Sequence, residues 1–325
     1  MHTPKEGYVL HTYGPERFVH HAAASVMTLR RHDAHRPVAL FCPDTHREHL
    51  RKHGKADLFE DIRVLPEEHA SITGFKHHLH RFMPYERTLF VDADIIWCRT
   101  PDPLWKQLQA YPFTATGNER ADFFFGGPKD WRIMIDVILN RRQRTIRRFG
   151  ITHLPRVQAG MVYCAHRDTA QSVCETAASF LAKRAQTHFR SRLAEGRSEE
   201  SCEWSLAMAM SQHNLEVFPW LQGRLSPQLD FVEDWTTYDP DFRNVTYRYY
   251  TDRAVYALRG IRNRALRTFL TDLASGLPGR GDYQEFTPVS LHFGWLHYKK
   301  PFQKFAERMW AMPVQPHERT ATATQ

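Results

Sequence analysis

The chain has 325 residues, which is enough for one large α/β domain or two average domains. Hydrophobic residues make up 42% of it and aromatic residues 13%, so a sizeable core is expected and extensive disorder is excluded. We expect loose structure only at the polar ends, Met1–Glu6 and Gln315–Gln325. The net charge of +8 suits anionic partners, such as nucleotide diphosphates, acidic glycans, nucleic acids or anionic membranes, and equally suits a soluble protein whose surface is simply basic.

No apolar run reaches the roughly 18–20 residues that cross a bilayer. The N-terminus also lacks the apolar region of a signal peptide, so we expect a cytoplasmic protein. The whole chain has five cysteines, an odd number, and none of them form a CxxC pair. This predicts free thiols rather than disulfides or zinc ligands.

Strand and helix patterns alternate over the first 120 residues. Short apolar stretches predict four strands: Gly7–Tyr13, Pro37–Cys42, Ile62–Leu65 and Thr88–Val91. Between them, apolar residues at helical spacing predict two helices: Glu16–Arg31 and Ile72–Phe82. This alternation predicts a largely parallel sheet with helices on both faces.

The order is less regular after Asp94. Later patterns predict one strand and three helices: Val157–Cys164, Asp168–Gln186, Glu203–Ser211 and the basic Ala254–Ala274. We expect Leu225–Arg253 to be irregular and the basic run Arg141–Arg148 to be solvated. The simplest division is one compact domain with a C-terminal elaboration: a core over residues 1–220, the elaboration over 221–290, a closing segment over 291–312 and a flexible tail over 313–325.

Two carboxylates, Asp92 and Asp94, follow the predicted strand that ends at Val91. Open α/β sheets bind ligands at the carboxyl ends of their strands. Buried there without a partner, the two carboxylates would repel each other and lose hydration. A divalent cation relieves this, and hard carboxylate oxygens suit Mg²⁺ or Mn²⁺, which also binds substrate phosphates. The alternative is a solvated turn or a helix cap, which the apolar residues on both sides of the pair disfavour.

The stretch with Phe75-Lys76, Met83-Pro84-Tyr85 and Arg87–Ile95, followed by Pro103-Leu104-Trp105, resembles glycosyltransferases of family 8. The resemblance implies the GT-A fold: a Rossmann-like, mainly parallel sheet flanked by helices, with a helical or irregular C-terminal elaboration. It implies a hexosyltransferase that takes a sugar from a nucleoside diphosphate sugar, with UDP as the expected nucleotide. It further implies Mn²⁺ or Mg²⁺ as cofactor and retention of anomeric configuration.

The resemblance also implies residue roles. Gln158-Ala159-Gly160 resembles the segment that reaches the donor sugar, and Glu203 resembles an acidic residue that holds sugar hydroxyls, so Gln158 and Glu203 are the candidate catalytic residues. The implied metal ligands are Asp92, Asp94 and His292. The implied donor-binding residues are His11, Thr12, Tyr13, Lys76, Asp92, Ala93, Asp94, Gly160, Gly294 and Lys300.

Some assignments have rivals. The spacing of the closing motif departs from the family pattern, which makes His297 an alternative to His292 as metal ligand. Tyr13 suits stacking on a pyrimidine base, but a strand-end aromatic can equally pack on the sheet. Glu203 and Lys76 could instead be ordinary solvated residues on helices, with no role in the site.

Other functions stay open: a nucleotidyltransferase, a glycosyltransferase acting on modified DNA bases, and a nucleic-acid-binding protein. The first normally has a glycine-rich signature after its first strand, where this chain has Gly14 alone. The last would use Arg141–Arg148 and Arg259–Arg267, which no readout motif accompanies. The acceptor is therefore open among glycans, lipid-linked molecules and DNA, and the basic helix suits peripheral contact with an anionic inner membrane face.

Overall fold

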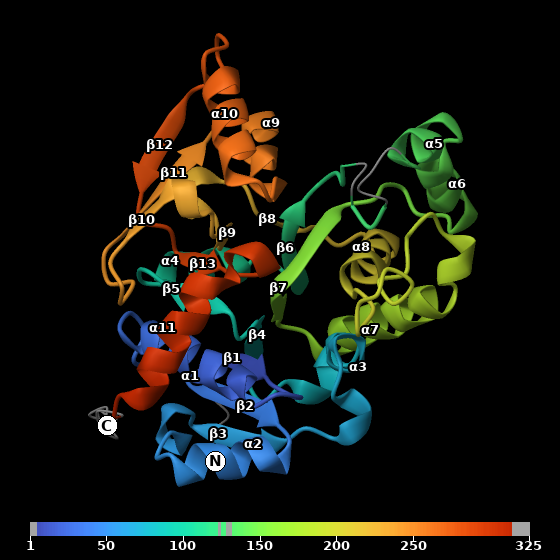
Figure 1. The fold of residues 1–325 in the computed structure, drawn as a ribbon. Coiled ribbons are helices and arrows are strands. Elements are labelled where there is room, and N and C mark those ends of the chain that lie inside the picture. The colour runs from blue at the N-terminus through green and yellow to red at the C-terminus, as the bar shows by residue number, and fades with distance from the viewer. Residues whose placement is uncertain (1–4, 123–124, 128–131, 314–325) are drawn as a thin grey trace.

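The computed structural model describes residues 5–122, 125–127 and 132–313 (Figure 1). Of the ends expected to be loose, only residues 5, 6 and 313 fall within these ranges. A seven-stranded sheet forms the centre, in the order β3 (Asp61–Val64), β2 (Val38–Cys42), β1 (Glu6–His11), β4 (Arg87–Val91), β7 (Arg156–Cys164), β6 (Phe113–Asn118) and β8 (Phe218–Pro219). The first four strands run parallel, and β7 is antiparallel to both of its neighbours. The expected mainly parallel sheet is confirmed.

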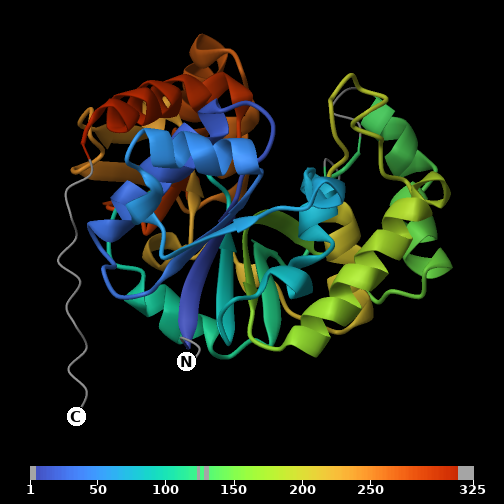
Figure 2. The same cartoon turned by 90° about the horizontal axis from the view of Figure 1, so that it is seen from below.

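The sheet is covered on both faces, which explains why its central strands β2, β4 and β7 are buried along most of their length. Along β1, Tyr8 and Leu10 enter one core and Val9 enters the other, because successive strand residues point to opposite faces. The first core includes the helices α1 (Arg17–Arg30), α2 (Asp44–Lys52) and α4 (Asp102–Leu108). The second includes α3 (Ile72–Lys76), α7 (Arg167–Ala182) and α8 (Glu203–Gln212). Figure 2 shows α7 on one side of the strands and α1 with α11 on the other.

Two small sheets add the C-terminal half to this core. One has the order β5 (Ile95–Trp97), β13 (Ser290–His292) and β9 (Leu229–Asp230). The other has the order β10 (Thr236–Tyr238), β11 (Val245–Tyr250) and β12 (Tyr283–Phe286). The remaining helices are α5 (Arg132–Ile138), α6 (Arg141–Arg148), α9 (Arg253–Ala257), α10 (Arg264–Ser275) and α11 (Lys299–Ala311). The first small sheet therefore combines strands from all three segments expected over residues 1–312.

Several expected elements differ in their bounds. The prediction of a single helix over Ile72–Phe82 is wrong, because α3 ends at Lys76 and a separate 3-10 turn covers Leu79–Phe82. The expected helix Ala254–Ala274 is divided into α9 and α10, because Asn263 leaves helical geometry and caps α10 through a hydrogen bond from the Leu266 backbone N–H. The stretch Leu225–Arg253 is not wholly irregular, since it contains β9, β10 and β11.

All five cysteines are buried free thiols, as expected. Within the described ranges, none of the helices combines the length and the apolar composition that a bilayer crossing requires.

Candidate functional site

Backbone pairing brings together residues that are far apart in the sequence. Asp92 follows β4, and its backbone N–H donates to the Gly160 carbonyl of β7 at 2.9 Å. Asp94 precedes β5, in which Ile95 pairs with His292 of β13. On its other side, His292 pairs with Asp230 of β9. The carboxyl end of β4 thus meets the ends of two strands from the C-terminal half.

The Asp92, Asp94 and His292 side chains form a compact group of potential metal ligands. One ligand atom from each lies within 4.8 Å of the others, and His292 Nε2 is 3.5 Å from Asp94 Oδ1. Two hard carboxylates with one imidazole suit Mn²⁺ or Mg²⁺, which complete their shells with water and phosphate oxygens. The residues present therefore fit the cation that the GT-A fold implies. Ala93, between the two aspartates, is half-buried.

Two lysines neutralise these carboxylates. The buried Lys76 donates from Nζ to Asp92 Oδ1 at 2.7 Å and to the Ala159 carbonyl at 2.7 Å. Lys299 donates to Asp94 Oδ2, also at 2.7 Å. Burial raises the pKa of Asp94, but the charges of Lys299 and His292 more than offset this and hold the pKa well below its usual range. The repulsion expected between the two aspartates is thus relieved by the chain itself.

The closing segment delivers Lys299 rather than Lys300 to this group. Helix α11 begins at Lys299, and the next side chain, Lys300, is exposed. The family resemblance implies Lys300 as a donor-binding residue, whereas in the structure the preceding lysine, at the start of α11, reaches Asp94.

His292 lies between two possible hydrogen-bond partners. Its Nδ1 is 2.8 Å from the amide nitrogen of Gln158 and 3.4 Å from Asp230 Oδ1. Burial lowers the pKa of His292, but the hydrogen bonds and charges of Asp230 and Asp94 raise it to about 10. A metal on Nε2 requires the ring proton on Nδ1; in that state the Asp230 carboxylate is the acceptor, and the Gln158 amide nitrogen, which is itself a donor, cannot pair with Nδ1.

The geometry distinguishes His292 from its rival. His297 lies on the 3-10 turn Leu296–Tyr298, where burial and the charges of Arg262 and Arg267 lower its pKa. It does not take part in the aspartate group, whereas His292 does. Gly294 leaves room for the His292 ring, because a Cβ at this position would lie 2.5 Å from its Cε1 and the ring would have to shift.

The Gln158 side chain is fixed by a polar network. Its Oε1 accepts from the Gly160 backbone N–H at 3.0 Å and from the amide of the buried Gln228. Gln228 also donates to Thr116 Oγ1 at 3.1 Å. A Cβ on Gly160 would lie 2.9 Å from Gln158 Oε1, so glycine keeps this network close to the backbone. These bonds hold the Gln158 amide in place beside the His292 ring.

Glu203 lies at the first residue of α8 and is half-buried. Burial raises the pKa of its carboxyl, and the charges of Arg156 and Arg192 with a hydrogen bond from the Ala159 backbone oppose that shift. The charge of His292 also lowers this pKa, which places Glu203 in the same electrostatic environment as the aspartate group. A half-buried carboxylate whose pKa is raised is a frequent feature of catalytic sites.

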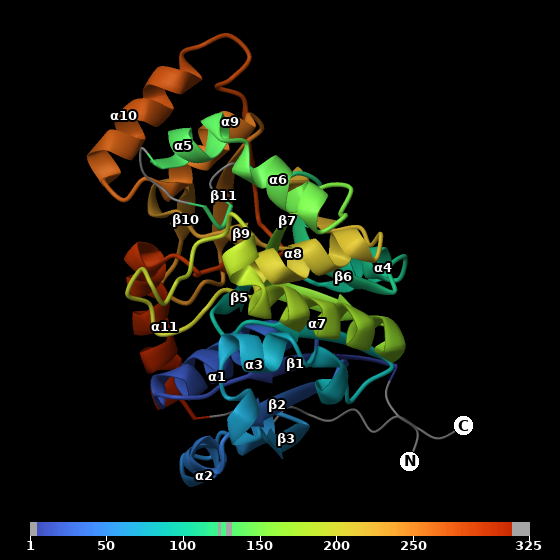
Figure 3. The same cartoon turned by 90° about the vertical axis from the view of Figure 1, so that its right-hand side faces the viewer.

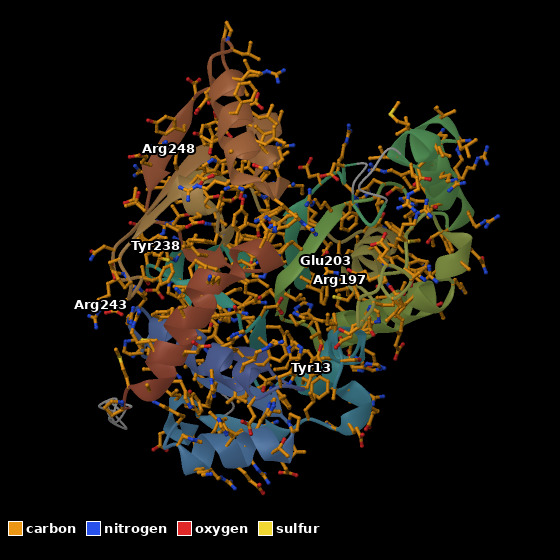
Figure 4. The ribbon with its side chains drawn as sticks, in the orientation of Figure 1. Tyr13, Arg197, Glu203, Tyr238, Arg243 and Arg248 are labelled. Atoms are coloured by element: carbon orange, nitrogen blue, oxygen red, sulfur yellow. The ribbon has the colours of Figure 1, made fainter. Side chains whose placement is uncertain are left out.

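The end of β1 lies beside the aspartate group, because the charges of Lys76 and Asp92 act on its last residue, His11. The ring of His11 stacks on Phe75 with centroids 3.9 Å apart, and burial lowers the pKa of His11 to about 3. The Thr12 hydroxyl is buried and bonded to His46 Nδ1 at 3.0 Å, so it holds the turn in place. Tyr13 donates from its hydroxyl to Glu199 Oε2 at 2.9 Å. Figure 4 shows Tyr13 and Glu203 in the middle of the molecule.

Three contributors were missed in the sequence: Asp230, Glu199 and Gln228. Asp230 accepts from Arg259 Nε and from Trp295 Nε1, each at 3.0 Å. Burial raises its pKa, but His292 and Arg259 outweigh this and hold the pKa well below its usual range. Asp230 is the second residue of the two-residue strand β9, inside a stretch without clear periodicity, so the sequence offers no local signal for it.

No protein-family model matches the chain, and no curated protein matches it in sequence. Its structure is similar to that of the galactosyltransferase LgtC, solved with donor and acceptor sugar analogues. The TM-score is 0.50 at 11% identity, over 96% of this chain and 98% of that one. Because the similarity extends over nearly the whole of both chains, the chain has the GT-A glycosyltransferase fold expected from its sequence.

Two further structures are similar to a lesser degree. The glycosyltransferase GlyE of Streptococcus pneumoniae TIGR4 gives a TM-score of 0.49 at 13% identity, over 95% of this chain and 60% of that one. Mouse xyloside xylosyltransferase 1 gives 0.44 at 14% identity, over 70% of this chain and 88% of that one.

Proposed function

We propose that the chain is a metal-dependent glycosyltransferase that moves a sugar from a nucleoside diphosphate sugar to an acceptor hydroxyl. The observation that carries this proposal is the group Asp92, Asp94 and His292 at the carboxyl end of β4 in a GT-A fold. A Mn²⁺ or Mg²⁺ ion bound there would neutralise the charge that develops on the departing diphosphate. Lys76 and Lys299 would contribute further positive charge to the same phosphates.

The donor that fits this site best is a UDP-sugar. Tyr13 lies just after the end of β1, where the hydrogen bond from its hydroxyl to Glu199 holds the side chain in place. This gives a pyrimidine base a rigid ring to stack on. His11 stays neutral at physiological pH, so its stack with Phe75 adds no charge to the wall near the ribose.

We propose transfer with retention, by displacement on the front face. The bond from the anomeric carbon to the diphosphate oxygen breaks, and the acceptor oxygen bonds to that carbon on the same face. The acceptor proton passes to the departing phosphate oxygen. Glu203 would bind the sugar hydroxyls and stabilise positive charge on the ring, and Gln158 would hold its side of the pocket in place.

Incubation with a panel of nucleotide sugars tests this function. We expect Mn²⁺-dependent release of UDP that chelator abolishes and that Glu203→Gln lowers strongly. Full release in excess chelator would contradict the metal requirement. Release of pyrophosphate from nucleoside triphosphates would instead identify a nucleotidyltransferase, and equal thermal stabilisation by GDP and UDP would contradict the choice of donor.

We also propose that α10 contacts an anionic membrane, which favours a lipid-linked acceptor. The helix is amphipathic with its apolar face outward: Leu266, Phe269 and Leu273 are 48%, 61% and 58% exposed. Its buried positions are polar instead, because Arg267 is 1% exposed and pairs with Asp234. An exposed apolar stripe at helical spacing is typical of helices that lie in a membrane interface.

A second apolar surface lies at the same end of the molecule. Met134 and Ile138 of α5 are exposed. Figures 1 and 3 both place α5 and α10 at the top of the molecule. Exposed arginines accompany both helices, among them Arg262 before α10 and Arg144 after α5. Apolar side chains with flanking positive charge suit a surface of anionic lipids.

Sedimentation with vesicles of phosphatidylglycerol and phosphatidylcholine tests this contact. We expect Phe269→Asp with Leu273→Asp to abolish binding, whereas the matched variant Leu225→Asp, at a residue 52% exposed elsewhere, should leave it intact. Equal binding by all three proteins would contradict the membrane role. A dimer in solution that the α10 variant dissociates would identify a second copy as the partner.

A further inference from the structure

A cleft of about 860 Å³ lies between α6 and the segment that joins α7 to α8. Six arginines line it: Arg141, Arg144, Arg147, Arg148, Arg184 and Arg190. No aspartate or glutamate is among its lining residues. The basic run Arg141–Arg148, which we expected to be solvated, therefore forms one wall of the cleft. Arg184 and Arg190, from the segment after α7, contribute to the other wall.

Few of these charges are balanced within the described part of the chain. Arg141 pairs with Asp136 at 3.0 Å, and Arg184 is 3.8 Å from Glu200. The structure shows no such pair there for Arg144, Arg147 or Arg190. Like charges gathered within about one Debye length, roughly 8 Å at physiological ionic strength, repel one another. An anion in the cleft would relieve this repulsion.

We propose that this cleft binds the phosphate groups of a phosphorylated glycan acceptor. Arginine presents its donors in a planar fork that matches phosphate oxygens in pairs. One phosphate monoester carries about −1.5 to −2 charges at neutral pH, so two or more phosphates balance most of the cleft. A hollow lined from two sides suits a compact charged group better than a duplex, which needs an extended basic face.

The cleft packs against the proposed transfer site through one of its lining residues, and this inference rests on the proposed function. The lining residue Phe189 stacks on Trp204 with centroids 4.7 Å apart, and Trp204 is adjacent to Glu203. The same inter-helix segment carries Glu199, which accepts from the Tyr13 hydroxyl and from the Ile72 backbone N–H. A phosphate held in the cleft would thus fix one end of the acceptor while its hydroxyl reaches the donor sugar.

Calorimetric titration with inorganic tripolyphosphate tests the anion site without requiring transfer. Chelator is present, so that no metal-linked phosphate binding at Asp92 and Asp94 contributes. We expect Arg144→Ala with Arg147→Ala to weaken binding at least about 10-fold, because hydrogen bonds to charged groups contribute that much each. The matched control, Arg51→Ala with Arg243→Ala, removes two exposed arginines far from the cleft: Arg51 is on α2, at the opposite end of the molecule from α6 (Figure 1), and Arg243 lies between β10 and β11 (Figure 4). It should change tripolyphosphate affinity less than about 2-fold. Equal losses in the two variants, or no binding by the unaltered protein, would overturn the site.

The source of the phosphate is tested with acceptors. With a phosphorylated oligosaccharide, we expect the cleft variant to raise KM at least about 10-fold, and with the same glycan after phosphatase treatment to leave KM unchanged. Equal effects on both glycans would overturn the acceptor role. Single-stranded DNA that binds more tightly as its length grows would overturn it in favour of nucleic acid. Failure of all transfer with tripolyphosphate binding intact would contradict the proposed function and leave the anion site standing.

Discussion

Replacing Asp230 by asparagine tests how the chain prepares His292 for a metal. The carboxylate is buried, with Oδ1 3.4 Å from His292 Nδ1 and Oδ2 bonded to Arg259 and Trp295. Asparagine keeps the shape of the side chain and removes its charge. Because a metal on Nε2 needs the proton on Nδ1, the substitution weakens the acceptor that holds this tautomer.

The size of the effect follows from the geometry. Loss of such a partner to a metal-binding histidine lowers metal affinity about 10- to 100-fold, or roughly 1.4–2.8 kcal/mol. Asp230→Asn also leaves the buried Arg259 without its carboxylate, and breaking a buried pair in this way costs about 3–5 kcal/mol of folding stability. The metal effect must therefore be separated from the stability effect.

The chain offers a matched control for this purpose. Asp234 pairs with the buried Arg267, and neither residue contacts His292. We expect Asp230→Asn and Asp234→Asn both to lower the melting temperature, but only the first to weaken Mn²⁺ binding in an electron paramagnetic resonance titration with UDP. In a His292→Ala background, Asp230→Asn should weaken Mn²⁺ no further. Equal losses of Mn²⁺ affinity in the two asparagine variants, or full additivity with His292→Ala, would refute the reasoning.

Three further outcomes are expected. His292→Ala should weaken Mn²⁺-dependent UDP binding while His297→Ala leaves it unchanged, and the reverse result in calorimetry would assign the ligand to His297. Lys299→Met should strengthen Mn²⁺ binding to the donor-free protein because it frees Asp94, whereas Lys300→Met should not; equal affinities in a titration would show that Lys299 does not compete. Burial lowers the pKa of His77 to about 4, so the stability it contributes is present above pH 6.5 and is lost as pH falls toward 4. His77→Gln should therefore reduce the loss of unfolding free energy between pH 7 and pH 5 by roughly 2 kcal/mol, measured by urea denaturation, and an unchanged pH profile would contradict this.

The sequence predicted those features that depend on local patterns. Each of the strands β1, β2 and β4 contains an apolar run of three to five residues, so their place in a covered sheet was predictable. The carboxylate pair after β4 was predicted for the same reason, because the end of a parallel strand is where such sheets bind ligands. His292 was found through a motif rather than through periodicity.

Features that depend on long-range contacts could not be predicted. Asp230 belongs to a strand of only two residues, and its closeness to His292 comes from the pairing of β9 with β13. Either Lys299 or Lys300 could face Asp94, and the choice depends on the residue at which α11 begins. A shift of that start by one residue would exchange the two lysines, and the sequence does not fix it so closely. The arginine cleft needs α6 and the distant Arg184–Arg190 segment to meet, and neither stretch indicates the other.

The ion pairs Lys76–Asp92 and Lys299–Asp94 change what a metal ion has to do at this site. Repulsion between Asp92 and Asp94 does not require a cation, because Lys76 and Lys299 already balance the two charges. A divalent ion added alone would leave excess positive charge beside these lysines, which low-dielectric surroundings make unfavourable. A diphosphate that enters with the ion restores the balance, because its oxygens can accept from the lysines. Metal and donor binding should therefore be positively coupled.

This coupling has a measurable form. UDP should raise Mn²⁺ affinity by the same factor by which Mn²⁺ raises UDP affinity, since coupling free energy is reciprocal. A coupling of about 1–3 kcal/mol corresponds to roughly 5- to 150-fold, which calorimetry resolves from both directions. Lys299→Met should reduce that factor, because it removes one of the positive charges that disfavour the ion alone. Mn²⁺ that binds equally tightly with and without UDP would show that the lysines yield to the metal at no cost, and the charge-balance argument would fail.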